Sequence, residues 1–162
     1  MKLFLKRDFS NEGALFIVFD NFGKEKFYVY RDMRHSHFSL AITDTNFNRL
    51  CSISTVPLPI FKAFTIKDKK SIIRLVFNKN TSRPMCYYYG ISWRIRGDII
   101  NKNFEVVDND NTILLTHRGS WSRSGDSYEL NITEGSRELF LIASAICVDL
   151  IESADEKQLQ TV

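Results

Sequence analysis

The sequence predicts a mainly β protein in which a closed antiparallel β-barrel encloses one hydrophobic C-terminal α-helix. Three observations point to this class. Aromatic residues make up 13% of the chain, and rings pack more readily in strands than in helices. Pairs of short apolar segments, each pair joined by a polar turn, recur along most of the chain. The longest apolar stretch, residues 139–151, lies near the C-terminus and has helical length.

Length, charge and cysteine content narrow the functional classes. The 162 residues suit one domain, expected over 1–155, with a frayed polar tail over 156–162. Lys and Arg (22) exceed Asp and Glu (19) by three charges, which is too few to indicate nucleic acid. Cys51, Cys86 and Cys147 form no C-x-x-C pair, so neither a zinc knuckle nor a redox pair is indicated. No metal and no cofactor are expected. Because no signal peptide or bilayer-spanning run is visible, we expect a cytoplasmic protein with no transmembrane segment.

A repeated hairpin pattern accounts for most of the expected strands. Each unit is an apolar strand, an aspartate, a few polar residues and a second apolar strand. Aspartate suits the turn because its carboxylate accepts hydrogen bonds from the backbone N–H groups just ahead. Asp20, Asp44 and Asp68 follow one another at intervals of 24 residues, and Asp108 opens a fourth turn, which predicts a meander. The expected pairs are 17–20 with 27–30, 41–44 with 50–53, 64–68 with 72–76, and 104–108 with 113–115.

Two further segments alternate between apolar and polar positions, as half-buried strands do. In residues 87–96 one face is expected to be buried and the other, with Tyr88, Arg94 and Arg96, to face solvent. The expected buried face is Tyr87, Tyr89, Ile91, Trp93 and Ile95. Residues 128–133 alternate in the same way. Pro57 and Pro59 interrupt the middle of the chain, so residues 56–60 are expected to form a link or an edge rather than a central strand.

The C-terminal helix is expected over about residues 137–154, with Ser136 as its N-cap. Between residues 139 and 151 only Ser144 and Asp149 are polar, so apolar side chains cover almost the whole circumference. Such a helix must be buried on every side, and in a chain of strands this requires the sheet to curl around it. Closure of the sheet into a barrel also removes the exposed edges of a long meander.

Four segments near the C-terminus resemble the LURP-one-related family. They are Trp93-Arg94-Ile95-Arg96-Gly97-Asp98, residues 104–108, residues 125–132 and the apolar helix that ends at Ile151. The first three are similar to the family's W-x-I-x-G-D, Y-x-I-x-D and D-x-Y-x-L-x-I patterns, in the same order. The family's fold is that of the tubby C-terminal domain and, more distantly, of phospholipid scramblases. The resemblance implies about twelve strands around a central helix; the basic residues with which tubby domains bind phosphatidylinositol bisphosphate cannot be matched here.

Some polar patterns have both a functional and a structural interpretation. His35 and His37 lie on one side of an extended segment and resemble half of a metal site, but surface histidines are the simpler interpretation. The third ligand of such a site would be distant in sequence: His117, Cys51 or Cys86. Residues 108–111 begin like a calcium loop but lack its later Gly and Glu, so we interpret them as a turn.

Asp149 lies inside the apolar helix, where an unpaired carboxylate would be costly. We interpret it as structural, bound to loop amides or to an arginine at the barrel mouth; the alternative is a catalytic acid with a raised pKa. Arg96-Gly97-Asp98 is interpreted as a strand end, not as an adhesion tripeptide. The serines of the expected loop 118–126 lack a G-x-S-x-G pattern, so a hydrolase is not indicated. The residues expected to be structural are Trp93, Gly97, Asp98, Tyr128, Ile146 and Asp149.

Basic side chains form the remaining candidate site. Each lysine or arginine near an anionic bilayer contributes about 1 kcal/mol of binding free energy, so five or six on one side of the molecule would hold it there. Lys6 and Arg7 form one exposed cluster. The candidate lipid-binding residues are Lys67, Lys69, Lys70, Arg94, Arg96, Arg118 and Arg123.

We therefore expect a non-enzymatic barrel protein, peripheral at the membrane, that binds anionic phospholipid headgroups or a protein partner. Two alternatives stay open: a carrier of a small apolar ligand inside the barrel, against which the central helix argues, and an enzyme of unrecognised type. A nucleic-acid binder is not expected, because its one sign is the run Tyr87-Tyr88-Tyr89 beside Arg94 and Arg96, and two of these tyrosines are expected in the core.

Overall fold

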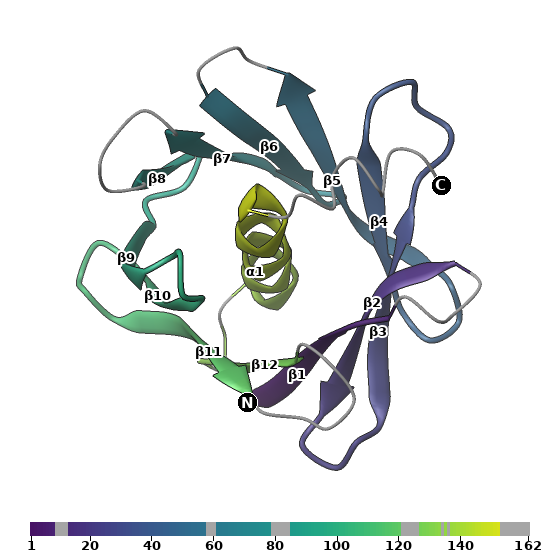
Figure 1. Cartoon of the computed structure of the whole chain (residues 1–162), viewed down its shortest axis with the longest axis horizontal. Helices are drawn as coiled ribbons and strands as arrows, with labels where there is room; N and C mark the ends of the chain where they lie inside the picture. The colour runs from purple at the N-terminus through teal and green to yellow at the C-terminus, as the bar shows by residue number, and fades with distance from the viewer. Residues whose placement is uncertain are drawn as a thin grey trace.

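A computed structural model describes residues 1–8, 13–57, 61–78, 85–120, 127–133, 135 and 137–152. Over these residues twelve antiparallel strands follow one another around a closed barrel, and β12 pairs with β1 to complete it (Figure 1). The predicted fold class is confirmed. The strands are β1 (Lys2–Arg7), β2 (Ala14–Asp20), β3 (Glu25–Arg31), β4 (Ser39–Thr43), β5 (Arg49–Pro57), β6 (Phe61–Lys67), β7 (Ile72–Asn78), β8 (Met85–Tyr89), β9 (Arg94–Asp98), β10 (Asn103–Val107), β11 (Ile113–Ser120) and β12 (Ser127–Ile132).

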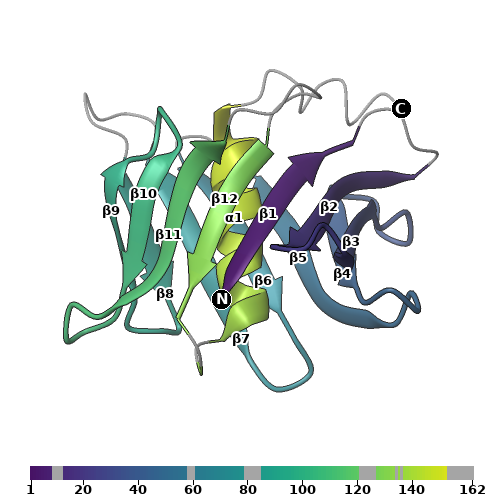
Figure 2. The ribbon, with the colours of Figure 1, turned by 90° about the horizontal axis from the view of Figure 1, so that it is seen from below.

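The predicted aspartate turns are all present. Asp20 Oδ1 accepts hydrogen bonds from the backbone N–H groups of Phe22 and Lys24, each at 2.9 Å. Asp44, Asp68 and Asp108 close the β4–β5, β6–β7 and β10–β11 turns in the same way. Because successive strands alternate in direction, these four turns lie at one end of the barrel, the end at which the helix begins (Figure 2).

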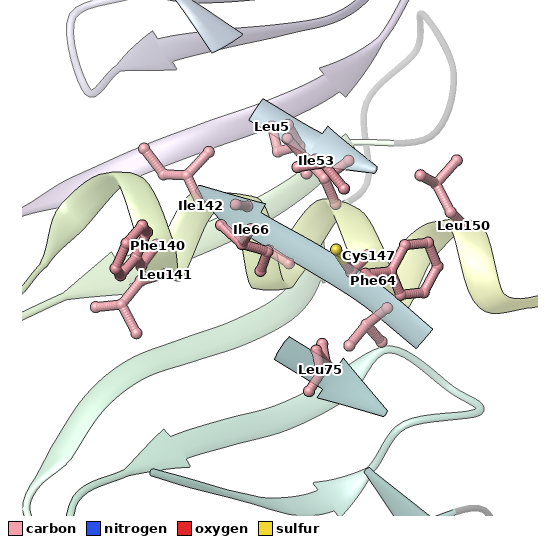
Figure 3. Close-up of a cluster of buried hydrophobic side chains, with 14 of the residues drawn as sticks. Leu5, Ile53, Phe64, Ile66, Leu75, Phe140, Leu141, Ile142, Cys147 and Leu150 are labelled. Atoms are coloured by element: carbon pink, nitrogen blue, oxygen red, sulfur yellow. The ribbon is translucent and has the colours of Figure 1, made fainter. Parts of the chain in front are cut away.

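The single helix of the described residues, α1 (Glu138–Glu152), runs through the middle of the barrel (Figures 1 and 2). Every residue from Phe140 to Leu150 is buried, including Ser144, whose hydroxyl donates to the Phe140 carbonyl at 2.7 Å. Strand residues such as Leu5, Phe64 and Leu75 pack against the helix (Figure 3). Ser136, the predicted N-cap, and the predicted tail 156–162 lie outside the described residues.

The predicted inner face of residues 87–95 is wrong at the tyrosines. Tyr87 and Tyr89 are 44% and 59% exposed, whereas Tyr88 points inward and packs against the core. The reason is a break at Gly90, which has φ of +86° and ends β8, so that the segment is not one continuous strand. The alternation restarts in β9, where Ile95 is half-buried as predicted.

Two predicted boundaries are also wrong. Pro57 belongs to β5 and pairs with Lys62 of β6, although residues 56–60 were expected to form a link or an edge. The strand tolerates proline at position 57 because the last hydrogen bond from β5 toward β4 is the one that the Thr55 N–H donates to the Phe38 carbonyl. An N–H at position 57 would find no partner on that side. Likewise Arg118 to Ser120, expected in a loop, continue β11 and pair with β12. Residues 121–126 of that loop lie outside the described residues.

Candidate anion-binding groove

A basic groove lies on the outer face of β4, β5 and β6. It has a volume of about 500 Å³ and is bordered by Arg49, Lys67 and Lys69 together with His35 and His37. Both lysines are exposed, Lys67 at the end of β6 and Lys69 in the following turn. The groove floor and remaining wall are formed by Ser39, Leu50, Cys51, Ser52, Ser54 and Asp68.

Strand register explains why the groove is open. Ala41, Ser52 and Lys67 lie side by side on β4, β5 and β6, so the row that runs from Lys67 toward β4 carries small side chains. The loop between β3 and β4, which carries both histidines, is held by Asp32. Arg49 Nη1 lies 2.7 Å from the Asp32 carboxylate.

The charges of the groove do not cancel. Arg34 forms a two-point ion pair with Asp32, with both contacts at 3.0 Å. Burial alone would raise the pKa of Asp32, but the hydrogen bonds and charge of Arg34 outweigh burial, so the pKa is lowered. Asp68 accepts hydrogen bonds at 2.7 Å from the N–H groups of Lys70 and Ser71. Asp32 is shared between Arg34 and Arg49. Together with Lys67, Lys69 and Asp68, these groups leave the groove with a surplus of positive charge.

The two histidines are surface residues that stack on one another. Their ring centroids are 5.3 Å apart, and His35 Nε2 lies 3.9 Å from the Asp32 carboxylate. His117, one of the distant ligands considered for a metal site, is fully buried inside the barrel. Among the described residues, no three His, Cys, Asp or Glu side chains are placed so as to hold a metal ion.

The other predicted lipid-binding residues lie elsewhere. Lys70 borders a separate pocket of about 370 Å³ with Ser71 and Arg137. Arg94 and Arg96 extend from β9, on the side of the barrel away from β4–β5 (Figure 1). Arg94 donates to Asn111 at 2.5 Å and Arg96 forms an ion pair with Glu105 at 2.8 Å.

Arg118, on β11, lies opposite Glu129, whose carboxylate also pairs with Lys2 at 3.1 Å. Arg123 lies outside the described residues. The predicted cations that the structure describes are therefore divided between two sides of the barrel, and those on β9 to β11 face carboxylates or amides.

The residues expected to be structural mostly occupy the barrel wall or interior. Trp93 packs edge-on against Tyr88, with 5.7 Å between centroids, and Ile146 is fully buried in α1. Gly97 adopts φ of +110° at the end of β9. Asp98 closes the β9–β10 turn by accepting a hydrogen bond from the Asn101 N–H at 3.0 Å.

Asp149 meets an arginine, Arg7 of β1, whose Nε lies 2.6 Å from its carboxylate. The expectation that Arg7 is exposed is therefore wrong: its side chain is 9% exposed and reaches inward to the buried acid. Lys102 Nζ lies 3.6 Å from the same carboxylate and 3.2 Å from the Val148 carbonyl. Lys62, from β6, donates to the Leu150 carbonyl at 3.1 Å.

These three cations stabilise the C-terminal end of α1, which has no basic residue in its own last turn. Helix C-termini carry partial negative charge on carbonyls that lack helical partners. Arg7, Lys62 and Lys102 come from three parts of the barrel wall, so they also fix the helix in position.

His117 contacts the backbone of Lys102, a member of this cluster, and its ring lies between two aromatic rings. The Phe104 ring is 4.5 Å away and stacked, and the Tyr128 ring is 4.8 Å away. Its Nδ1 lies 2.6 Å from the Lys102 carbonyl, so Nδ1 carries the proton in the neutral ring. Burial lowers the pKa of His117 to about 4, and the ring is neutral at pH 7.

Comparison with known sequences and structures shows similarity to a protein family, to a curated protein and to a solved structure. A sequence model of the family described as LURP-one-related matches residues 1–149. The uncharacterized protein YxjI of Bacillus subtilis (strain 168) is 26% identical over 159 residues, which are 98% of each chain. A crystal structure of an Arabidopsis thaliana protein superimposes with a TM-score of 0.63 at 12% identity, over 94% of this chain and 91% of that one. In the described residues no helix has the length and apolarity needed to cross a bilayer.

Proposed function

The chain belongs to the LURP-one-related family, and we propose that it is a peripheral, non-catalytic protein that binds the phosphate groups of anionic membrane lipids through its basic groove. The observation that carries the proposal is the convergence of Arg49, Lys67 and Lys69 around one open groove, where positive charge stays in surplus although Asp32 pairs with Arg49 and Asp68 lies in the lining. Residues from three strands and a turn meet there, although they are distant in sequence.

The chemistry of the lining suits phosphate. An arginine guanidinium offers paired N–H donors in a fixed plane, and each lysine ammonium is a compact, mobile point charge. The hydroxyls of Ser52 and Ser54 lie in the same groove and are small enough to let a headgroup approach. Each cation near an anionic surface contributes about 1 kcal/mol, so binding should be weak and sensitive to salt.

The packed interior is why we prefer surface binding to a carrier function. Ile142, Ile146 and Leu150 of α1 are fully buried where a carrier would hold its ligand. Catalysis is not proposed for the groove either. Burial raises the pKa of its thiol, Cys51, to about 12, so the nucleophilic thiolate is not available at neutral pH.

Vesicle co-sedimentation at low salt tests this function. We expect the chain to bind vesicles of phosphatidylcholine with phosphatidylserine and not vesicles of phosphatidylcholine alone. The double variant Lys67→Gln/Lys69→Gln should lose most of this binding. Arg94→Gln/Arg96→Gln is the matched control, because it removes the same two charges from the opposite side of the barrel and should bind nearly as the parent does.

Equal losses in the two double variants would show that net charge alone matters and would overturn the groove assignment. An absence of binding to the anionic vesicles, at a salt concentration that exaggerates electrostatic attraction, would overturn the lipid function and favour a protein partner.

A further inference from the structure

Three aromatic side chains form a partly exposed cluster beside the groove. Tyr28 and Tyr30 extend from the outer face of β3, and Phe47 comes from the β4–β5 turn. The Phe47 ring stacks on Tyr28 with 5.6 Å between centroids and lies 6.0 Å from Tyr30. Phe47 remains 65% exposed despite these contacts. We call these three residues the aromatic cluster.

Phe47 occupies a position that folding alone does not favour. Its φ of 63° is left-handed, a conformation that suits glycine or asparagine and is unusual for a bulky side chain. The turn is fixed in this form: Phe47 N–H donates to the Asp44 carbonyl at 3.1 Å, and the Asp44 carboxylate accepts from the N–H groups on either side. The turn thus presents a large apolar ring to solvent on strained backbone.

The aromatic cluster and the groove share one continuous surface. Tyr30 pairs with Ala41, Ala41 with Ser52, and Ser52 with Lys67, so one row crosses β3 to β6 from the cluster to the groove. Three strand spacings of about 4.8 Å put the two ends of the row roughly 14 Å apart, and only small side chains stand between them. Arg49 follows Phe47 by two residues and lies opposite Thr43, the partner of Tyr28.

We propose that this face lies flat against an anionic bilayer, with Phe47 inserted at the level of the headgroups while Arg49, Lys67 and Lys69 contact lipid phosphates. The inference rests on the proposed function and adds an apolar contact and an orientation to it. Aromatic rings are favoured at the membrane interface, where the apolar acyl chains meet the polar headgroups. Two carboxylates lie beside the cluster and both are hydrogen-bonded: Glu25 accepts from the Tyr28 hydroxyl, and Asp44 accepts from N–H groups of its own turn.

The variant Phe47→Asn separates this insertion from simple charge attraction. Asparagine tolerates the left-handed backbone, so the turn should keep its form. We expect binding to phosphatidylcholine–phosphatidylserine vesicles to weaken about tenfold, at low and at high salt alike, because an apolar contact is not screened. Ile100→Asn is the control: Ile100 is 51% exposed in the β9–β10 turn, at the other end of the barrel, and its variant should bind as the parent does.

A second readout reports insertion directly. In vesicles that contain brominated phosphatidylcholine, Phe47→Trp should show added fluorescence quenching over the parent chain, and Ile100→Trp should show none. Equal quenching of the two variants, or unchanged binding of Phe47→Asn, would overturn the insertion.

A soluble probe separates failure of the insertion from failure of the groove. Inositol hexakisphosphate offers phosphate groups without a bilayer, so its binding should be lost in Lys67→Gln/Lys69→Gln and kept in Phe47→Asn. Binding of this probe without binding to vesicles would overturn the bilayer orientation and leave a phosphate-binding groove. Failure of both ligands would overturn the proposed function together with the inference.

Discussion

His117 shows at the scale of one residue how the barrel interior changes the chemistry of a side chain. It lies between the rings of Phe104 and Tyr128, and its Nδ1–H is directed at the Lys102 carbonyl. Burial disfavours the charged ring, and this effect outweighs the attraction of the Asp149 carboxylate, which would favour it. The folded protein therefore keeps the ring neutral, whereas the unfolded chain would protonate it under mildly acidic conditions.

This difference makes stability depend on pH. The pKa is about 4 in the folded state and 6.5 in the unfolded state, so the unfolded chain binds the additional proton between these values. The contribution of His117 is therefore complete above pH 6.5 and is lost as the pH falls toward 4, by roughly 3 kcal/mol in all. We expect urea unfolding of His117→Gln to show a flatter pH profile over this window. Parallel profiles for the variant and the parent would contradict this expectation.

Gly97 is required by the backbone around it. A Cβ at this position would lie 2.8 Å from the Asn103 carbonyl oxygen and 3.0 Å from Phe104 Cα, and φ is +110°. We expect Gly97→Ala to lower the free energy of unfolding by at least about 2 kcal/mol in urea denaturation. Gly119→Ala is the control because nothing lies within 4 Å of its Cβ position, and a change within about 0.5 kcal/mol is expected. Similar losses in both variants would refute the steric explanation.

Individual contacts were the least predictable part of the molecule. Lys67 and Lys69 were proposed from the sequence as lipid-binding residues, but nothing near them indicated that Arg49 would join them. That meeting depends on the pairing of β4, β5 and β6, which sequence patterns do not specify. Arg7 was misplaced for a similar reason, because a basic residue at a strand end looks exposed until its buried partner is known.

At the scale of elements, α1 depends on cations that it does not itself contain. Its last turn ends among Arg7, Lys62 and Lys102, and the Asp149 carboxylate is 3% exposed beside them. A buried pair of this kind gives little net stability over apolar residues, but the loss of one partner leaves a charge without compensation. The cluster therefore specifies the position of the helix more than it adds to the stability of the fold.

A double-variant cycle measures this coupling. We expect Arg7→Leu to cost about 3–5 kcal/mol of unfolding free energy, because Asp149 stays buried with weaker compensation. Arg7→Leu/Asp149→Leu should recover at least half of that loss, because both charges are then absent. The measurement is chemical denaturation of the two single variants and the double variant. Strict additivity of the two single losses would contradict the coupling.

Element boundaries were predictable where local chemistry sets them. The aspartate turns follow from hydrogen bonds within a few residues, and the helix follows from an apolar circumference, so the turns and the presence of a C-terminal helix were predicted correctly from the sequence. The inner face of β8 was not, because the break at Gly90 shifts the alternation between two strands. The apolar positions from Tyr87 to Ile95 have the period of a single strand, and the sign of the break is the glycine at position 90 within them.

At the scale of the whole molecule, the barrel and the helix require each other. The buried face of nearly every strand packs on neighbours that surround α1, including Leu5, Ile53 and Leu75 (Figure 3). The meander alone would close around an empty apolar space, which close packing does not tolerate. The helix, apolar on all sides, would have no favourable place in water.

The sequence and its family match indicate the fold of the whole molecule, but they do not indicate its function. Helix burial indicated a barrel, and the match to the LURP-one-related family extends over residues 1–149, well beyond the C-terminal segments that carried the resemblance. The Arabidopsis thaliana structure, at 12% identity, supports the fold alone. The groove depends on side chains of this chain, so its role has to be tested on this chain.

Truncation after residue 136 tests most directly the claim that the central helix holds the barrel together. The thermal unfolding of the chain without residues 137–162, followed by near-UV circular dichroism, is the measurement. Without α1, residues such as Phe64 and Ile66 lose the surface on which they pack. We predict that the truncated chain shows no cooperative transition, whereas the full chain shows a sharp one. A sharp transition in the truncated chain would show that the strands form a stable barrel by themselves and would contradict this account.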